Sequence, residues 1–224
     1  MLHYKINLEI HSRQASNTSF QLGEINPLSP SQKVLGEMPV ITPEIEAELV
    51  KKWEENPMRA PRLAKVVVNV SIGSNFERLK KIASVLEEIT GQKPSFRRAK
   101  KTIKEFGIKR GEPIAVAVTL RKGRALDFLK KALDAVGYRL KAGSFDDEGN
   151  VCFGVKEHIQ LPGVKYDPEV GIFGMDVCIS IERPGYRVMR RRRCRSTIPR
   201  RHRVSRIEAM VLLKKLFGVE IVES

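Results

Sequence analysis

Residues 89–121 read ITGQKPSFRRAKKTIKEFGIKRGEPIAVAVTLR and join the two patterns that decide the fold. The amphipathic pattern before this stretch predicts a helix that ends at Gly91, and the pattern over 113–120 predicts a strand. The segment between them is strongly basic, with Glu105 as the one acidic residue between 93 and 110. A cationic loop held between a helix and a strand is typical of a protein that binds a polyanion. The basic residues of this loop are Lys93, Arg97, Arg98, Lys100, Lys101, Lys104, Lys109 and Arg110.

The net charge of +15 is concentrated in two segments of the chain. Residues 183–206 contain eleven Arg and no acidic residue, and residues 93–110 form the second basic segment. The rest of the chain is slightly acidic, so the positive charge is not a general device for solubility. Two concentrated cationic segments on a near-neutral body predict binding to a phosphate backbone.

Composition and cysteine spacing exclude several classes of protein. Cys152, Cys178 and Cys194 are widely spaced and form no CxxC motif, which argues for a reducing compartment and against a disulfide framework or a zinc site. No apolar run approaches the roughly 20 residues that cross a bilayer. The first residues lack the order of a signal peptide. We therefore expect a cytoplasmic protein without membrane contact.

The chain is expected to consist of an arm and one domain. Residues 1–41 are rich in Ser, Asn, Gln, Pro and Gly without a sustained period, so they predict an N-terminal arm that is extended or ordered by a partner. A flexible tail is the alternative interpretation. Residues 42–224 are expected to form a single α+β domain.

Helix signals recur through this domain. Thr42 is a candidate cap for the first helix, in which Trp53 is expected to be a packing anchor. Capping boxes at 74–77 and 205–208 predict two further helix starts, and Leu126 is expected on the apolar face of another helix. The expected helices cover 42–56, 74–91, 123–136 and 205–218.

Strand signals alternate with these helices without a regular βαβ repeat. Strands are expected over 65–70, 113–120, 151–155 and 175–181. This order predicts a mainly antiparallel β-sheet covered on one face by helices, with long basic loops. The other face of the sheet would then be free to meet a large partner.

Asn69 is out of keeping with its strand. Residues 65–70 read KVVVNV, a pattern that is apolar on both faces apart from this amide. Asn69 either caps a turn near Gly73 or directs its amide toward a ligand. Both interpretations stay open from the residues alone.

The sequence offers no catalytic constellation, metal site or cofactor motif. Asp146, Asp147 and Glu148 form an acidic triplet that is compatible with a Mg²⁺-dependent nuclease. Their setting in the turn FDDEGN favours a solvated hairpin instead. Cys194 and His202 lack two further ligands nearby for a zinc site. We therefore expect no enzyme activity and no cofactor.

The Arg-rich segment is expected to be an internal RNA-binding loop. A run such as that at 190–193 is often a solvated tail, but here a strand precedes it and a capped helix follows it. The Arg guanidinium suits phosphate because its planar fork binds two oxygens at once. No helix-turn-helix or zinc-finger spacing is present to read duplex DNA. RNA, which is recognised largely by shape and backbone, is the better polyanion.

Five blocks of sequence carry a family resemblance. They read NPMRAPRLAKVVVNVSIG (56–73), EEITGQKPSFRRAKKTIKEFGIKRGEPI (87–114), VTLR (118–121), FDDEGNVCFGVKEHIQLPGVKYDPEVGIFGMDV (145–177), and ERPGYRVMRRRRC with IPRRHRVSRIEAM (182–194 and 198–210). In this order they resemble the large ribosomal subunit protein five family, the universal proteins that bind 5S rRNA in the central protuberance. The extension before the last helix resembles the archaeal branch of that family.

The resemblance implies the residues that meet RNA. It assigns the 5S rRNA contact to Asn69, Gln92 and Thr119. Charge and proximity add phosphate partners at Arg59, Arg62, Lys65, Lys93 and Arg121. The loop 99–111 is expected to reach P-site tRNA through Lys100, Lys101, Lys104, Lys109 and Arg110. A second basic loop is expected to bind rRNA through Arg187, Arg190, Arg191, Arg192, Arg193, Arg195, Arg200, Arg201, His202 and Arg203.

The resemblance also implies the partners and the cellular place. They are 5S rRNA, large-subunit rRNA, P-site tRNA, a small-subunit head protein at an intersubunit bridge and neighbouring central-protuberance proteins, in the cytoplasmic ribosome. Ser71 departs from the Gly that is usual for the family, and no function carries over to residues 1–41. An RNA-processing or RNA-modifying enzyme and a DNA-compacting protein are the alternative hypotheses.

Overall fold

A five-stranded antiparallel β-sheet is the centre of the structure, a computed structural model that describes residues 42–222 except 74 and 165. The strand order is β2-β3-β1-β6-β5, and each neighbouring pair is antiparallel. A separate parallel pair joins β4 to β7. The strands are β1 (Arg62–Ser71), β2 (Ser95–Arg98), β3 (Pro113–Leu120), β4 (Arg139–Lys141), β5 (Asn150–Val155), β6 (Met175–Glu182) and β7 (Glu220–Val222).

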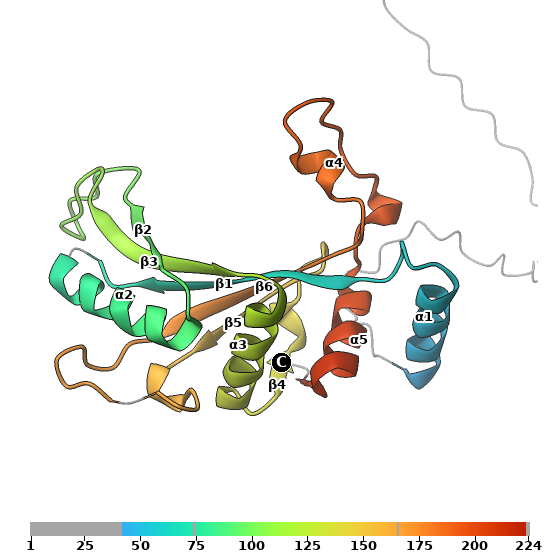
Figure 1. Cartoon of the computed structure of the whole chain (residues 1–224), viewed down its shortest axis with the longest axis horizontal. Coiled ribbons are helices and arrows are strands. Elements are labelled where there is room, and N and C mark those ends of the chain that lie inside the picture. Colours follow the sequence, from blue (N-terminus) through green and yellow to red (C-terminus); the bar gives the residue numbers. More distant parts are fainter. Residues whose placement is uncertain (1–41, 74, 165, 223–224) are drawn as a thin grey trace, which may run out of the picture. The chain divides into compact units, whose positions relative to one another are not determined.

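Helices cover one side of this sheet, as Figure 1 shows for α2, α3 and α5. The expected α+β fold is therefore confirmed. Within the described part of the chain, no helix is long and apolar enough to span a membrane. The helices are α1 (Pro43–Glu55), α2 (Phe76–Thr90), α3 (Lys122–Ala135), the short α4 (Arg187–Arg190) and α5 (Arg206–Phe217), with 3₁₀ turns at Ala142–Ser144, His158–Gln160 and Arg200–His202.

The core lies between the sheet and its helices. Val66, Val68 and Val70 of β1 are buried, whereas Val67 and Asn69 on the other face are half-buried. Only one face of this strand is covered, although its sequence is apolar on both faces apart from Asn69. The covered face packs against Leu79, Ile82 and Leu86 of α2, Leu129 and Leu133 of α3, and Met210 and Leu213 of α5.

Helix ends follow the capping signals with two corrections. Ser205 and Glu208 form the expected capping box, and Gly91 ends α2 in the left-handed conformation at φ 64°. The predicted start of α2 lies one residue too early, because Asn75 is the cap and its side chain accepts from the Arg78 N–H at 3.1 Å. Thr42 precedes α1 but its side chain makes no capping hydrogen bond. Local side-chain hydrogen bonds therefore fix the starts of α2 and α5 but not that of α1.

Two further packing expectations can be compared with the structure. Trp53 is buried at 8% exposure and is confirmed as a packing anchor. Leu126 is 37% exposed, so its expected place on the buried face of α3 is wrong. Ala125 and Phe128 take that place, because they lie beside Leu129 on the sheet-facing side. The expected arm at 1–41 lies outside the described residues, and its separation from a domain at 42–224 remains a prediction.

Candidate nucleic-acid interface

The face of the sheet opposite to α2, α3 and α5 is built from transverse rows of short side chains. Partners in an antiparallel register lie on the same face. Asn69 of β1 pairs with Ala117 of β3 and Asp176 of β6, and these pair in turn with Ser95 and Gly154. One row therefore crosses all five strands. We call this side of the sheet the open face.

A second row runs beside the first. It joins Thr119, Val67, Cys178 and Cys152 through the registers of β3, β1, β6 and β5. Small side chains dominate both rows, so the open face offers a shallow surface on which a large partner can approach the strands closely. Asn69 and Thr119 are diagonal neighbours on this surface, since Thr119 pairs with Val67, two positions before Asn69.

Gln92 is tied to the edge of the open face. Its Nε2 donates to the Thr119 carbonyl at 3.1 Å, across the turn that follows α2. The Thr90 hydroxyl also reaches this turn, where it lies 3.3 Å from the Gln92 carbonyl. The structure therefore brings together the three polar residues that the resemblance singled out, Asn69, Gln92 and Thr119.

The turn near Gly73 is held by backbone groups. The N–H groups of Ile72 and Gly73 donate to the Ile114 carbonyl at 3.3 and 3.4 Å. The position of Asn69 on the open face favours the ligand interpretation over the turn-capping one. Ser71 lies at the end of β1, opposite Ala115 of β3, and continues the strand without a break.

Residues 99–112 form a hairpin with its own hydrogen bonds, here called the basic hairpin. Ala99 and Gly111 close its base, with the Ala99 N–H donating to the Glu112 carbonyl at 2.8 Å and the Gly111 N–H donating to the Ala99 carbonyl at 2.9 Å. Ile103 and Ile108 exchange backbone bonds at 2.9 and 3.1 Å nearer the tip. The five basic residues expected to contact tRNA, Lys100, Lys101, Lys104, Lys109 and Arg110, are all exposed here.

Residues 183–206, here called the arginine loop, use some of their Arg side chains to hold the fold. Arg183 is 7% exposed and forms an ion pair with buried Glu208. Arg206 donates to the Ala142 carbonyl. Neither residue is among the expected rRNA ligands, and both guanidinium groups face protein partners.

Acidic residues from outside the arginine loop brace it further. Glu182 pairs with Arg190, and Glu148 pairs with Arg203. A ring nitrogen of His202 lies 2.8 Å from the Pro184 carbonyl. The sequence shows no acid within the loop, and these pairs join positions too far apart in the chain to be read from it. The other expected rRNA ligands are all exposed: Arg187, Arg191, Arg192, Arg193, Arg195, Arg200 and Arg201.

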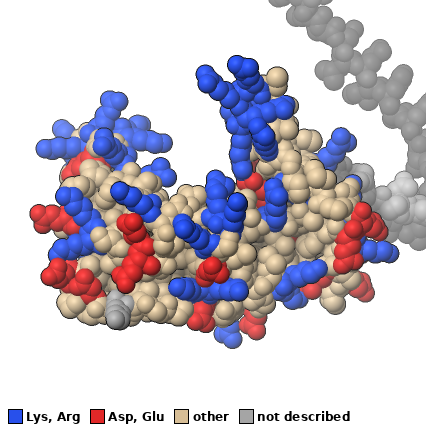
Figure 2. Space-filling view, in the orientation of Figure 1, with Lys and Arg blue, Asp and Glu red and all other residues tan. Residues whose placement is uncertain are grey.

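The two basic segments rise on the same side of the sheet. Figure 2 shows Lys and Arg gathered on two projections with a hollow between them, and Figure 1 identifies these projections as the basic hairpin and the α4 region. Both lie on the side opposite to α2, α3 and α5. The other expected phosphate partners, Arg59, Arg62, Lys93 and Arg121, are exposed, and Lys65 is half-buried beside Val67 on β1.

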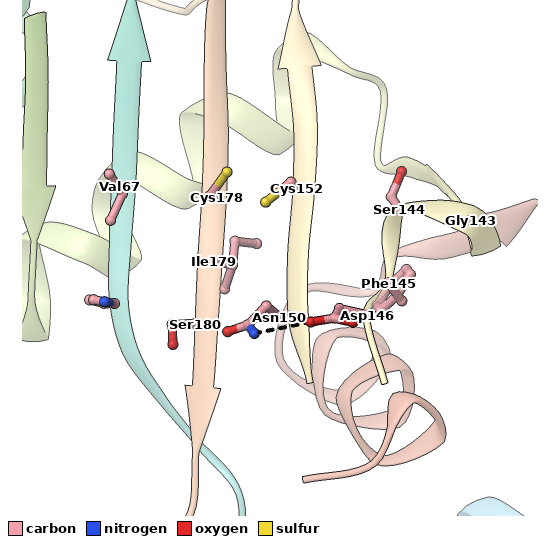
Figure 3. A pocket seen from close by; sticks show the side chains of 11 residues that line it. Val67, Gly143, Ser144, Phe145, Asp146, Asn150, Cys152, Cys178, Ile179 and Ser180 are labelled. Atoms are coloured by element: carbon pink, nitrogen blue, oxygen red, sulfur yellow. Dashed lines mark hydrogen bonds between the residues drawn. The ribbon is translucent and has the colours of Figure 1, made fainter. Parts of the chain in front are cut away.

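A shallow pocket lies on the open face along β6 and β5, as shown in Figure 3. Lys65, Ser180 and Asn150 form its polar side, and Cys178 and Cys152 lie along the same two strands. The Asn150 Nδ2 donates to Asp146 at 3.4 Å. The pocket therefore combines hydrogen-bonding groups with an apolar and sulfur-lined floor.

The acidic triplet at 146–148 is part of a turn. The Asp146 side chain accepts from the Asp147 N–H at 2.8 Å, and its carbonyl accepts from the Gly149 N–H at 3.1 Å. Glu148 forms an ion pair with Arg203. All three acidic side chains are exposed. This arrangement is that of a solvated hairpin.

An open sheet face between two cationic projections is typical of the class of proteins that bind a large polyanion on a basic surface. Residues 56–109 match the family model described as Ribosomal protein L5, and residues 113–216 match the model of the C-terminus of the same ribosomal family. The chain belongs to the ribosomal protein L5 family, a family of structural, non-enzymatic constituents of the large ribosomal subunit.

Similar archaeal proteins cover most of the chain. The large ribosomal subunit protein uL5 of Aeropyrum pernix is 61% identical over 183 residues, which are 81% of this chain and 95% of that protein. The uL5 proteins of Pyrobaculum aerophilum and Sulfurisphaera tokodaii are 56% and 57% identical over 175 and 169 residues. These matches cover 75% of this chain in each case, and 98% and 96% of the two relatives. The expected archaeal type is confirmed.

Proposed function

We propose that this chain binds 5S rRNA on the open face of its sheet and helps to attach it to the large subunit in the central protuberance. The observation that carries this proposal is the convergence of Asn69, Gln92 and Thr119 on that shallow face. Primary amides and hydroxyls can donate to and accept from RNA bases and 2′-hydroxyl groups. The short side chains around them leave room for the RNA backbone to approach.

Surrounding cations supply the nonspecific part of this binding. Arg59, Arg62, Lys65, Lys93 and Arg121 would neutralise phosphates around the polar centre, which raises affinity without reading sequence. The exposed Arg residues of the arginine loop would grip large-subunit rRNA. Their bidentate geometry suits phosphate oxygens. Family membership supports RNA as the polyanion.

The basic hairpin is proposed to reach P-site tRNA. It carries its exposed cations on a hairpin with its own backbone hydrogen bonds. A small-subunit head protein and neighbouring proteins of the central protuberance are proposed as further partners. These assignments rest on the family resemblance and on the exposure of the hairpin side chains.

Binding to a 5S rRNA transcript tests the proposed site. We expect Asn69→Ala and Gln92→Ala each to raise the Kd for the transcript about tenfold, since each removes a hydrogen bond to RNA worth roughly 1–2 kcal/mol. Gln160→Ala is the matched control, because Gln160 is an exposed amide in the turn His158–Gln160. Wild-type affinity for both site variants would show that the contact residues are assigned wrongly.

The alternative of an RNA-processing enzyme makes a different prediction. Replacement of Asp146, Asp147 and Glu148 together would then abolish a metal-dependent activity on RNA. The turn hydrogen bonds of Asp146 and the ion pair of Glu148 favour a structural role for these side chains. We therefore keep the structural RNA-binding function as the conclusion.

A further inference from the structure

Cys152 and Cys178 are direct neighbours across two strands. They occupy opposite positions in the antiparallel register of β5 and β6. Residues placed in this way have Cα atoms about 4.5–5.5 Å apart, and disulfides span Cα separations of about 4.4–6.8 Å. Figure 3 shows the two sulfur atoms turned toward each other over the pocket. The backbone therefore already holds the two residues at a separation that a disulfide can bridge.

The neighbouring thiol also affects the acidity of Cys152. Partial desolvation and the proximity of Cys178 raise the pKa of Cys152 to about 12. A thiol with a raised pKa carries little thiolate at neutral pH, so Cys152 reacts slowly with other disulfides. Access is nevertheless open, because Cys152 is exposed and both residues line the pocket.

We propose that Cys152 and Cys178 form a reversible redox site that low-molecular-weight disulfides oxidise to an intrachain disulfide. One thiolate attacks a sulfur of the small disulfide and releases one small thiol. The second cysteine then attacks the mixed disulfide and releases the other small thiol. The protein pair loses two protons and two electrons, and the small disulfide gains both. The second step is fast because the partner sulfur is already adjacent.

Cys194 provides an internal comparison. It is exposed in the arginine loop and has no Cys partner in any strand register of the described residues. The same small disulfide should therefore stop at a mixed disulfide on Cys194. This difference in product separates a built dithiol site from general thiol reactivity.

The position of the pair links it to the proposed function. Cys178 pairs with Val67, which pairs with Thr119, so the dithiol ends the row that begins at a proposed 5S rRNA contact. The expected effect of RNA on this pair rests on the proposed function. RNA bound on the open face should cover the pair and slow its oxidation.

The full-length chain is incubated with oxidised glutathione at graded ratios to reduced glutathione, quenched with acid and analysed by intact mass and peptide mapping. We expect the peptides that contain Cys152 and Cys178 to be recovered joined, with a mass two hydrogens below the sum of the separate peptides. Cys194 should carry one glutathione. In Cys178→Ser, Cys152 should retain a glutathione adduct, and Cys194→Ser should form the same bridge as wild type. Glutathione adducts on both 152 and 178 in the wild-type chain, without a linked peptide, would overturn the proposal.

Repeating the reaction with saturating 5S rRNA separates the two claims. Bridging that slows at least about tenfold supports both the dithiol site and its place under RNA. Bridging at an unchanged rate supports the dithiol site and contradicts binding of RNA over this part of the open face.

Discussion

His158 lies in the core at 1% exposure, stacked on Phe173 with ring centroids 4.1 Å apart. The Phe173 N–H donates to its Nδ1 at 3.5 Å, which requires an unprotonated nitrogen. Burial lowers the pKa of His158 below its ordinary value. This imidazole is therefore a neutral packing group, although a lone His in the sequence gives no sign of it.

The lowered pKa of His158 predicts a pH dependence of stability. Because the unfolded chain binds the proton more readily, the free energy of unfolding should fall as pH drops below about 6.5, by at most about 1.4 kcal/mol per pH unit. His158→Phe keeps the stacked ring and should remove this part of the slope. Urea unfolding at about pH 7.5 and about pH 5, on either side of the ordinary His pKa, measures it. An identical pH dependence in both proteins would contradict the assignment.

Asn69 illustrates what a single residue in the sequence can predict. A polar residue in an apolar strand correctly marks a position on the open face, because strand periodicity alone decides which side chains share a face. The contact of Gln92 with the Thr119 carbonyl cannot be read from composition or period. It depends on the turn after α2 meeting a strand 27 residues further along the chain.

At the scale of elements, α5 and the arginine loop are stabilised as one unit. The Arg183–Glu208 pair joins the start of the loop to the first turn of α5, and Arg183 also donates to the Arg201 carbonyl at 3.3 Å. Both partners of this ion pair are nearly fully buried. Both ends of the arginine loop are therefore anchored to the fold. This anchoring limits the conformations that the loop can adopt before RNA binds.

Breaking this buried pair should destabilise the fold. Glu208→Gln leaves the Arg183 charge buried without a countercharge, so we expect the free energy of unfolding to fall by about 3–5 kcal/mol. The control is Glu220→Gln, which breaks the exposed pair between Arg139 and Glu220 and should cost no more than about 1 kcal/mol. Chemical denaturation of both variants measures the difference. Equal losses would show that burial of the Arg183 pair is unimportant.

The basic hairpin should be separable from 5S rRNA binding. Its base is closed by the Ala99–Glu112 and Gly111–Ala99 backbone bonds, so residues 100–110 can be replaced by a short Gly-Ser turn without cutting the sheet. We expect this variant to bind a 5S transcript within about twofold of wild type and to lower P-site tRNA occupancy in reconstituted ribosomes. Loss of 5S affinity would show that the hairpin and the open face act as one site.

The sequence predicts elements better than the contacts between them. Strand and helix periods and the Gly91 and Gly218 stops locate most of the fold, because these signals are local. The prediction for Leu126 fails since a helix of this length offers two adjacent apolar stripes, and only the sheet selects between them. The ion pairs of Glu148 and Glu182 with the arginine loop could not be predicted from the sequence. Residues paired between distant segments follow no characteristic spacing along the chain.

Over the molecule as a whole, positive charge is concentrated on two projections from a body that carries charges of both signs. Figure 2 shows acidic side chains over the body and basic side chains on the projections. Several Arg residues are held by protein carboxylates, so fewer than the eleven of the arginine loop are free to release counterions from RNA. The salt dependence of RNA binding should therefore depend on the exposed Arg residues of the arginine loop.

Neutralising exposed members of the arginine loop should reduce that salt dependence. Arg192→Gln, Arg193→Gln and Arg195→Gln together should lower the slope of log K against log salt for rRNA by about 2 to 3, because each lost phosphate contact contributes about 0.7–0.9. Lys130→Gln with Lys131→Gln on α3 is the control and should leave the slope unchanged. Titrations between about 50 mM and 300 mM salt give both slopes. An unchanged slope in the triple variant would place these Arg side chains outside the RNA contact.

5S rRNA is proposed to lie on the open face. Photo-crosslinking tests it most directly, with benzoylphenylalanine placed either at Val67 in the middle of the open face or at Leu126 on α3 across the sheet. Both variants are assembled with a 5S rRNA transcript and irradiated, and crosslinked RNA is quantified on a denaturing gel. We expect strong crosslinking from position 67 and only background from position 126. Crosslinking from position 126 with none from position 67 would contradict the account.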